Sequence, residues 1–389
     1  MSRRSLDIIH IYAGTSGSAG TYINEIFTAL KGKYTQEIFV SYYYPFSYGK
    51  NVFYKYSDLS SPYSYLKRNQ LFRYGLRYVE LLFALIHILF YLSKRKVKLV
   101  NYNLTSDLRI EYWFLSFLKL FKIKIAITCH DVIPFGLDDS NKTNKIKVKK
   151  RFFDFADFLI VHNENSIEEL RNILNIRENK VFKFSFPIMN LSNFPANGIS
   201  AVPDIFISND PSTFRVGMVG HFRKEKGLDI MLRAWNLFCN STKKAELFLV
   251  GNFTKGIDTS SISVSKNIHI YDQFVDDSMY ISVIKNCDLI VLPYKRGTNS
   301  GIPSSVISLG TLLITSDIEM FRNNSLINDS YLFRSDNEID LCAKIEWLYS
   351  LSNVEREQLI TRNFELLNKY RIEFEKSIQC CFSVLCKKQ

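Results

Sequence analysis

The sequence predicts an α/β protein with two doubly wound domains, each built on a parallel sheet. Short apolar runs of strand length alternate with amphipathic helical stretches along most of the chain, which is typical of successive βαβ units. The alternation stops once, over residues 185–213, where Pro, Asn and Ser are frequent, as in a linker. The length of 389 residues, with 47% hydrophobic residues, is sufficient for two cores. We therefore expect four segments: an N-terminal domain at 1–190, a linker at 191–213, a second domain at 214–352, and C-terminal helices at 353–389 that pack back towards the first domain.

The first half begins with a predicted strand over residues 6–14. A glycine-rich turn with Gly14, Gly17 and Gly20 follows, and such a turn between a strand and a helix lets the backbone approach a ligand closely. The other expected elements, in order, are helix 22–30, strand 37–41, helix 70–93, strand 98–103, helix 108–121, strand 124–129, strand 158–161 and a helix that ends near residue 174.

The second half repeats this pattern. A buried strand at 216–219 leads through a loop into a helix that Gly227 begins, with an apolar face at helical spacing formed by Leu228, Met231, Leu232, Trp235 and Cys239. A capping box from Ser352 to Glu355 begins a helical tail. Between these, the patterns predict strands 246–251 and 267–271, helix 276–286, and strands 288–293 and 311–317.

The loop after strand 216–219 carries three cations, Arg223, Lys224 and Lys226. They lie beside the expected N-terminus of a helix, whose dipole is positive at that end. Such a turn can hold a phosphate or diphosphate, and each charge-assisted hydrogen bond there would contribute roughly 1.5–3 kcal/mol. A solvated basic turn without a ligand is the alternative.

His130 and Asp131 follow strand 124–129 directly. The carboxyl ends of parallel strands are the edge at which open α/β sheets bind their ligands. His130 is therefore a candidate site residue, and a structural histidine with satisfied hydrogen bonds is the alternative.

The positive charge is unevenly distributed. Residues 1–200 hold 28 Lys and Arg against 16 Asp and Glu, and so carry the whole net charge of +12, whereas residues 201–389 hold 22 of each. The stretch 142–151 has six cations and no acid. A basic first half indicates an acidic partner, either membrane lipid or nucleic acid.

Helix 70–93 contains twelve largely apolar residues, 81–92, which are too few to span a bilayer. It is either a core helix with basic ends or an element close to a membrane surface. Its flanking cations are Arg68, Arg73, Arg77, Lys94, Arg95, Lys96 and Lys98. The seven cysteines form no C-x-x-C pair and no metal-like cluster with histidine, which indicates a reducing compartment.

Together these features resemble the GT-B glycosyltransferases, and the motifs resemble glycosyltransferase family 4 (group 1). Lys226 matches the family's diphosphate-binding lysine, and Arg223 fits a common variant in which the arginine comes three residues after the glycine. Asn299, Ser300 and Gly301 resemble the loop that meets the donor, and Gly310 the glycine that closes the next helix. His130 and the Gly14–Gly20 turn match their counterparts in the first domain.

The chain departs from the family pattern at one place. The family has two glutamates eight residues apart around the donor loop, whereas residues 296–310 contain no acidic side chain. The first glutamate's place falls near Thr298 or Asn299, and the second, which binds the donor's ribose, near Ser305 or Val306. We still expect an active enzyme, because the cationic loop and His130 are retained.

The resemblance implies two Rossmann-like domains facing across a cleft and a hexosyltransferase-type glycosyltransferase that retains anomeric configuration. Its donor would be a nucleotide sugar, bound by Gly17, Gly20, Arg223, Lys226 and Asn299–Gly301, with a nucleoside diphosphate as product. His130, Arg223 and Lys226 would be catalytic, and no cofactor or metal would be needed. The acceptor would be a glycan or lipid-linked glycan of surface polysaccharide such as lipopolysaccharide or capsule. We expect a cytoplasmic protein, peripheral at an anionic membrane surface at the inner face of the plasma membrane.

Four alternatives remain open at this point. A sugar-nucleotide epimerase shares the fold, and an inactive GT-B partner subunit would explain the missing glutamates. A nucleic-acid binder fits the charge, but no known binding module is present, so we expect no nucleic-acid partner. A short-chain dehydrogenase fits the glycine spacing, but strand 37–41 ends without an acidic residue to hold a ribose, and the Y-x-x-x-K pair of Tyr63 and Lys67 comes too early in the chain.

Overall fold

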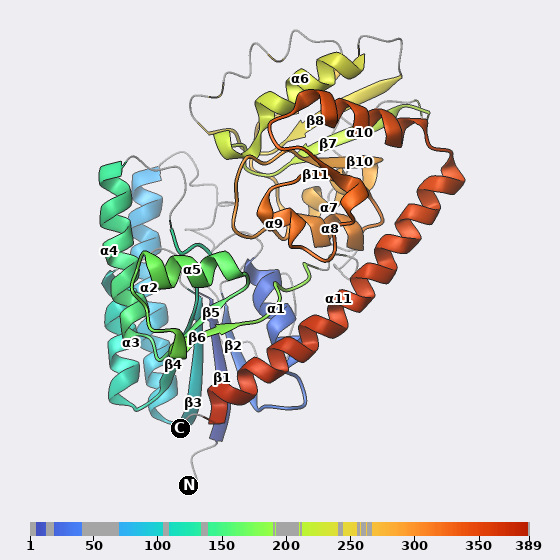
Figure 1. Cartoon of the computed structure of the whole chain (residues 1–389). Coiled ribbons are helices and arrows are strands. Elements are labelled where there is room, and N and C mark those ends of the chain that lie inside the picture. Colours follow the sequence, from blue (N-terminus) through green and yellow to red (C-terminus); the bar gives the residue numbers. More distant parts are fainter. Residues whose placement is uncertain are drawn as a thin grey trace. The chain divides into compact units, whose positions relative to one another are not determined.

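The computed structural model describes residues 5–12, 19–40, 70–103, 109–133, 139–189, 191, 210, 212–239, 244–254, 257, 262 and 267–387. The chain divides into two compact units, Met1–Ile188 with Ile372–Gln389, and Met189–Arg371. Each unit contains a six-stranded parallel sheet with helices on both faces (Figure 1). The predicted fold class, two doubly wound α/β domains, is confirmed. Most of the predicted linker lies outside the described residues.

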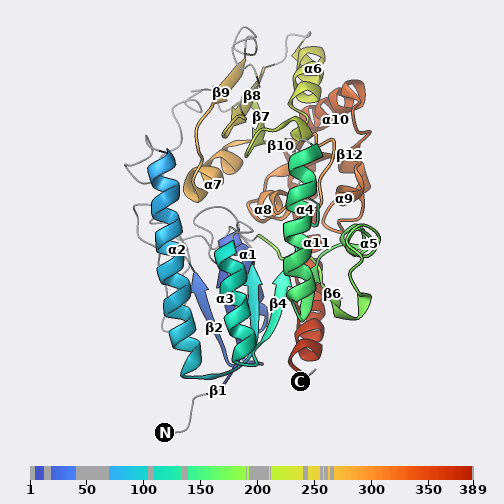
Figure 2. The same ribbon diagram turned by 90° about the vertical axis from the view of Figure 1, so that its left-hand side faces the viewer.

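The first unit has the strand order β2-β1-β3-β4-β5-β6. Helices α2 (Gln70–Ser93), α3 (Arg109–Leu120) and α4 (Asp139–Phe155) lie side by side on one face of the sheet, with α3 in the middle (Figure 2). Helix α1 (Ala19–Ala29) and the end of α11 lie on the other face, and α5 (Glu164–Asn172) follows β5. The strands are β1 (Ser5–Tyr12), β2 (Gln36–Val40), β3 (Lys96–Asn103), β4 (Lys124–Thr128), β5 (Phe158–Val161) and β6 (Val181–Lys183).

A row of buried polar side chains crosses this sheet. The His10 Nε2–H donates to Gln36 Oε1 (3.1 Å), and Asn101 Nδ2 donates to His10 Nδ1 (3.1 Å). Gln36 Nε2 in turn donates to the carbonyl of Phe27 (2.7 Å). These bonds hold a neutral imidazole, and burial lowers the pKa of His10 to about 4.

The second unit has the strand order β12-β11-β10-β7-β8-β9. Helices α6 (Leu228–Cys239) and α10 (Glu338–Ser350) cover one face, and α7 (Asp277–Asn286), α8 (Ile302–Ser308) and α9 (Glu319–Arg322) cover the other (Figure 1). Every residue of β10 is buried, as expected for a central strand covered on both faces. The strands are β7 (Phe214–Val219), β8 (Ala245–Val250), β9 (Ile268–Tyr271), β10 (Leu289–Leu292), β11 (Leu312–Ser316) and β12 (Leu332–Phe333).

The basic stretch 142–151 belongs to α4, a helix that the sequence reasoning did not predict. Phe152 and Phe153 anchor α4 in the core of the first unit, and Arg151 lies over the ring of Tyr112 on α3, 4.2 Å from its centroid. Tertiary packing thus stabilises a helix whose cations repel one another.

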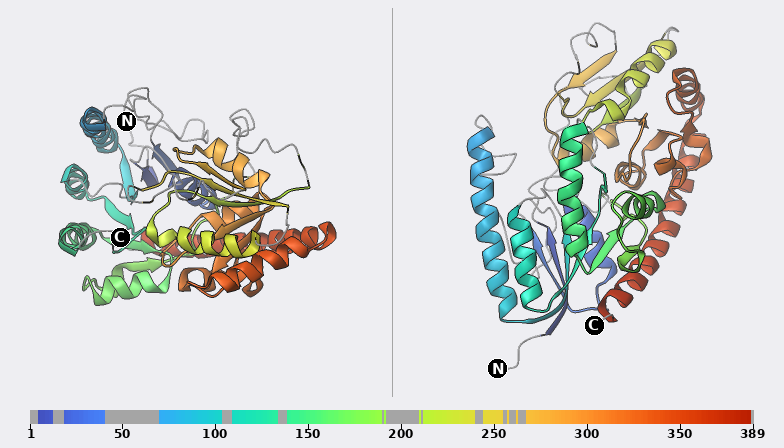
Figure 3. Two further views of the ribbon diagram at one scale, coloured as in Figure 1. Left: turned by 90° about the horizontal axis from the view of Figure 1, so that it is seen from above. Right: turned by 60° about the vertical axis from the view of Figure 1, so that its left-hand side comes forward.

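The tail forms a single helix, α11 (Asn353–Lys387), which contributes to the second unit up to Arg371 and to the first from Ile372 (Figure 3). The predicted capping box is confirmed, since the Ser352 N–H donates to Glu355 Oε2 (2.8 Å) and the Glu355 N–H to Ser352 Oγ (3.3 Å). No helix in the described parts of the chain has the length and apolar character needed to cross a membrane.

Candidate functional site

The two predicted donor loops of the second unit follow neighbouring strands, β7 and β10. From β7 the chain goes on to β8 and β9 on one side of the sheet, and then crosses to β10, β11 and β12 on the other side. The carboxyl ends of β7 and β10 therefore form a topological switch point, the position at which doubly wound sheets bind ligands. Long-range strand pairing thus brings together residues 220–227 and 293–301.

A close backbone contact joins the two loops. Gly227 ends a 3-10 turn (Lys224–Lys226) in the left-handed conformation (φ +70°), so α6 begins at Leu228 and not at Gly227 as predicted. A Cβ at Gly227 would lie 1.7 Å from the carbonyl oxygen of Pro293, so only glycine fits there. The Lys295 N–H donates to the Glu225 carbonyl (2.9 Å), which adds a second link between the loops.

The cations of the first loop differ in their partners. Arg223 is half-buried, and within the described structure its Nε–H is buried without a hydrogen-bond partner. The Lys226 ammonium lies 3.6 Å from the centroid of the buried Tyr294 ring, a cation–π contact between the loops. The loop's own carboxylate, Glu225, pairs with Arg296 (3.2 Å). Arg223 therefore presents an unsatisfied guanidinium donor at the switch point, where an anion would satisfy it.

His221 stands directly after Gly220 in the cationic loop. Partial burial and then the charge of Arg223 lower the pKa of His221. A neutral imidazole is thus expected at pH 7, so the positive charge of the loop comes from Arg223, Lys224 and Lys226.

Asn299, Ser300 and Gly301 lead from β10 into α8 and are all half-buried. Gly301 is the N-cap of α8, and the Ile302 N–H donates weakly to Ser300 Oγ (3.4 Å). The three predicted donor-loop residues thus lie together at the carboxyl end of β10.

Serines of α8 hold the segment that enters the second unit. Ser304 Oγ accepts from the Met189 N–H (2.9 Å), and Ser308 Oγ from the Leu191 N–H (3.3 Å). The Ser305 hydroxyl lies 3.2 Å from the Met189 carbonyl and 3.1 Å from that of Gly301, and it donates to these oxygens. The position of the missing second glutamate is therefore used to hold the backbone.

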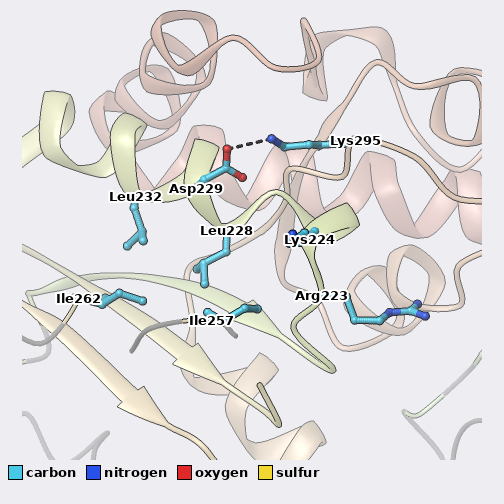
Figure 4. A pocket seen from close by; sticks show the side chains of 8 residues that line it. All are labelled: Arg223, Lys224, Leu228, Asp229, Leu232, Ile257, Ile262 and Lys295. Carbon is cyan, nitrogen blue, oxygen red and sulfur yellow. Dashed lines mark hydrogen bonds and ion pairs between the residues drawn. The ribbon is translucent and has the colours of Figure 1, made fainter. Parts of the chain in front are cut away.

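A pocket of about 400 Å³ adjoins the cationic loop (Figure 4). Its apolar wall consists of Leu228, Leu232, Ile257 and Ile262. Asp229 and Lys295 form an ion pair (2.8 Å) on its polar side, and Arg223 and Lys224 line the rest (Figure 4). The pocket thus offers an apolar surface beside three cations, one of which is paired with Asp229.

In the first unit His130 lies at the carboxyl end of β4, half-buried, and its Nε2–H donates to Asn103 Oδ1 (3.2 Å). Burial lowers the pKa of His130 to about 4. The imidazole is therefore neutral at pH 7 with its proton on Nε2, which makes Nδ1 an acceptor.

Tyr22 and His162 complete the cluster around His130. The Tyr22 ring packs edge-on against His130, with 4.7 Å between centroids, and its hydroxyl donates to His162 Nε2 (2.9 Å). His162 Nδ1–H donates to the Phe184 carbonyl (3.1 Å), and burial lowers its pKa to about 3. His130 thus rests on an aromatic and hydrogen-bonded support from α1, β3 and β5.

The comparisons with known proteins agree with this arrangement. Residues 213–350 match the family model described as Glycosyl transferases group 1. Among solved structures, an E. coli protein described as trehalose-6-phosphate bound with UDP-2-fluoro glucose has 12% identity and a TM-score of 0.65, over 98% of this chain and 99% of that one. Sucrose-phosphate synthase from Thermosynechococcus elongatus has 16% identity and a TM-score of 0.62, over 98% and 96%. Residues 213–350 are thus similar to group 1 glycosyl transferases, and the whole chain has the GT-B fold.

A third GT-B structure, Anabaena HepE in complex with UDP and glucose, has 12% identity and a TM-score of 0.62, over 98% of this chain and 99% of that one. At 12% to 16% sequence identity, the similarity to these three structures shows that the chain has the GT-B fold. No curated protein sequence matches the chain.

Some site residues of this GT-B chain were predicted and others were missed. Gly17 lies outside the described residues, and Gly20 lies in the first turn of α1. Sequence reasoning missed Tyr294, which directly follows the predicted strand 288–293, and His162, which directly follows β5 as His130 follows β4. Their position just beyond a strand was the available signal.

Proposed function

We propose that the protein is a hexosyltransferase that moves a sugar from a nucleotide-sugar donor to a glycan or lipid-linked glycan. The observation that carries this proposal is the cationic pair Arg223 and Lys226 at the switch point of a group 1 domain, with the Arg223 Nε–H buried and unpaired among the described residues. Diphosphate is the anionic group of a nucleotide sugar. Two similar structures support a donor of this class. One is described as bound with UDP-2-fluoro glucose, and the other as a complex with UDP and glucose.

In the proposed reaction, the bond between the anomeric carbon and the diphosphate oxygen breaks, and negative charge develops on the departing diphosphate. Arg223 and Lys226 stabilise that charge, and preorganised donors of this kind make the largest contribution to such reactions. Within the described chain, no three His, Cys, Asp or Glu side chains are grouped so as to hold a metal ion. We assign charge neutralisation to Arg223 and Lys226.

The acceptor hydroxyl would attack on the face that the diphosphate leaves and give its proton to a departing phosphate oxygen, with retention of configuration. Asn299, Ser300 and Gly301 would orient the donor. The neutral His130 would lie beside the sugar near its reacting face. Its support by Tyr22 and Asn103 suits a positioning task.

We further propose a lipid-linked acceptor in surface polysaccharide synthesis and work at an anionic membrane. The support is the net charge of +12, all of which lies in residues 1–200. An acceptor embedded in lipid would require the enzyme to come to the bilayer surface, at the inner face of the plasma membrane.

An inactive GT-B partner subunit is the second candidate. Residues 296–310 contain no carboxylate, and the Ser305 hydroxyl is engaged by backbone carbonyls. This candidate predicts nucleotide binding without hydrolysis or transfer of the sugar, so the two functions differ in a turnover assay.

The test is a thermal-shift screen of the full chain against nucleoside diphosphates and their sugars, followed by turnover with the donor that stabilises it most. We expect stabilisation by at least one diphosphate, since a ligand at 100 times its Kd stabilises by about 2.7 kcal/mol. Arg223→Ala and Lys226→Ala should each lower turnover about tenfold or more, because each removes one charge-assisted contact.

Lys285→Ala is the matched control. It removes an exposed cation in the last turn of α7, which precedes the amino end of β10, whereas the cationic loop lies at the carboxyl ends of the strands. It should leave both binding and turnover unchanged. If Arg223→Ala and Lys226→Ala both retain near-normal turnover, the assignment of the cationic loop is wrong.

A further inference from the structure

Helices α2 and α3 carry large apolar side chains on their outward faces. On α2 the core receives Leu81, Leu85 and Ile88, while a second apolar stripe stays exposed, with Phe83 at 66% and Phe90 at 61% exposure. Besides these two, the stripe includes Tyr78, Val79, Leu82 and Ile86, at helical spacing. A soluble helix that buries one face normally presents polar residues on the other, so this second stripe indicates a binding surface.

The neighbouring helix α3 extends the same surface. Trp113 is 66% exposed and Leu120 is 74% exposed, and Phe117 between them and Phe121 just beyond the helix are also exposed. α2 and α3 pack side by side on one face of the sheet (Figures 2 and 3). Their exposed residues therefore point away from the sheet on the same side of the unit.

The charged side chains around this apolar surface are mainly cationic. The only carboxylates within α2 and α3 are Glu80, which is half-buried, and Glu111, which is buried and accepts from the Tyr102 hydroxyl (2.7 Å). Lys94, which lies 3.8 Å from the centroid of the Phe90 ring, and Lys122 follow the C-terminal ends of α2 and α3. Exposed Lys145 and Lys147 lie on α4, next to α3.

We propose that the outward faces of α2 and α3 dock on an anionic lipid bilayer by inserting their apolar side chains below the headgroups. Exposed Trp, Tyr and Phe with flanking lysines suit the boundary between headgroups and acyl chains. Charge complementarity selects a membrane over a second copy of the chain, since two such faces would bring like charges together. The reason for docking rests on the proposed function, because docking would bring the enzyme to a lipid-linked acceptor.

This surface predicts a behaviour that charge alone does not. Binding through α4 and other exposed lysines would end as salt rises, because salt screens exposed charges. Apolar insertion is insensitive to screening. Part of the binding should therefore survive in high salt, and that part should depend on α2 and α3.

The first measurement is sedimentation of the full chain with vesicles of phosphatidylcholine containing about 30% phosphatidylglycerol, in salt from about 50 to about 500 mM. The double variant Phe83→Ser with Leu120→Ser should lower the partition coefficient about tenfold or more at high salt, from the lost burial of two large side chains. Ile339→Ser is the matched control, because Ile339 is 70% exposed on α10 in the other unit. Lys145→Glu with Lys147→Glu should weaken binding mainly at low salt.

The second measurement uses Trp113, which is the only tryptophan of the first unit, because the other two are Trp235 and Trp347. Brominated phosphatidylcholine should quench the fluorescence of the wild-type protein but not that of Trp113→Phe. Complete release by salt, no effect of the apolar variants, or no quenching of Trp113 would each overturn the proposal. So would a dimer in sedimentation equilibrium that the apolar variants dissociate while vesicle binding stays unchanged.

Nucleotide stabilisation, measured on the same variants, separates this proposal from the proposed function. Apolar variants whose calorimetric transitions match those of the wild type are folded, so their vesicle binding tests the surface alone. A protein that binds vesicles as expected but no nucleotide would refute the glycosyltransferase function and leave the docking surface standing.

Discussion

Gly227→Ala should disrupt the link between the two loops of the second unit. A Cβ at Gly227 would lie 1.7 Å from the Pro293 carbonyl oxygen, whereas ordinary contact begins near 3.4 Å, so the two backbones must separate. The left-handed backbone (φ +70°) alone costs an alanine about 1–2 kcal/mol. With the Lys295 to Glu225 hydrogen bond strained as well, we expect a total of about 3–5 kcal/mol.

Gly32→Ala provides the matched control. Gly32 has nearly the same backbone conformation (φ +80°), but nothing lies within 4 Å of its added Cβ. It should therefore show the backbone strain alone, about 1–2 kcal/mol. The difference between the two variants measures the clash with Pro293.

Calorimetry of the full chain is the assay, and it should report each unit's transition separately where the two differ in stability. We expect Gly227→Ala to lower the melting temperature of the second unit by about 10 °C, at about 2–4 °C per kcal/mol for a unit of this size. Diphosphate affinity should fall with it, because a displacement of about 1 Å can cost about a hundredfold in function. Equal destabilisation by the two variants, with diphosphate affinity intact in Gly227→Ala, would refute this account of the site.

Two further predictions concern titration and ribose binding. Because burial lowers the pKa of His10 from 6.5 to about 4, its contribution to stability is complete above about pH 6.5 and is lost as pH falls towards 4, by up to about 3 kcal/mol. Urea unfolding between these pH values should therefore show a shallower pH dependence in His10→Gln than in the wild type, and identical slopes would contradict the assignment. The Ser305 hydroxyl is bonded to backbone carbonyls and Val306 is buried, so neither is expected to bind the ribose hydroxyls. Removal of the 2′-hydroxyl from a nucleoside diphosphate should therefore weaken its binding by less than about tenfold, or roughly 1.4 kcal/mol. A hundredfold preference for ribose in competitive inhibition would show that another group binds the hydroxyl pair.

The alternation of strands and helices and the position of the cationic loop can be predicted from the amino-acid sequence. Strands such as β5 and β10 are short, continuous apolar runs, because both of their faces are buried, and such runs can be read locally. Arg223 and Lys226 stand between such a strand and an amphipathic helix, and Ser352 and Glu355 form a cap within a single turn. These features depend on neighbours in the chain, so sequence patterns are sufficient to predict them.

Contacts between residues that are distant in the sequence depend on how the strands and helices pack. Tyr294 lies against Lys226 because β10 pairs with β7, and α4 forms because Phe152 and Phe153 are buried, which its basic sequence does not indicate. Helix α2 has apolar residues on two sides, so the periodicity of its sequence does not show which side packs against the core. Packing on the sheet buries the stripe that contains Leu85 and leaves Phe83 exposed, because a helix can turn only one side towards the core.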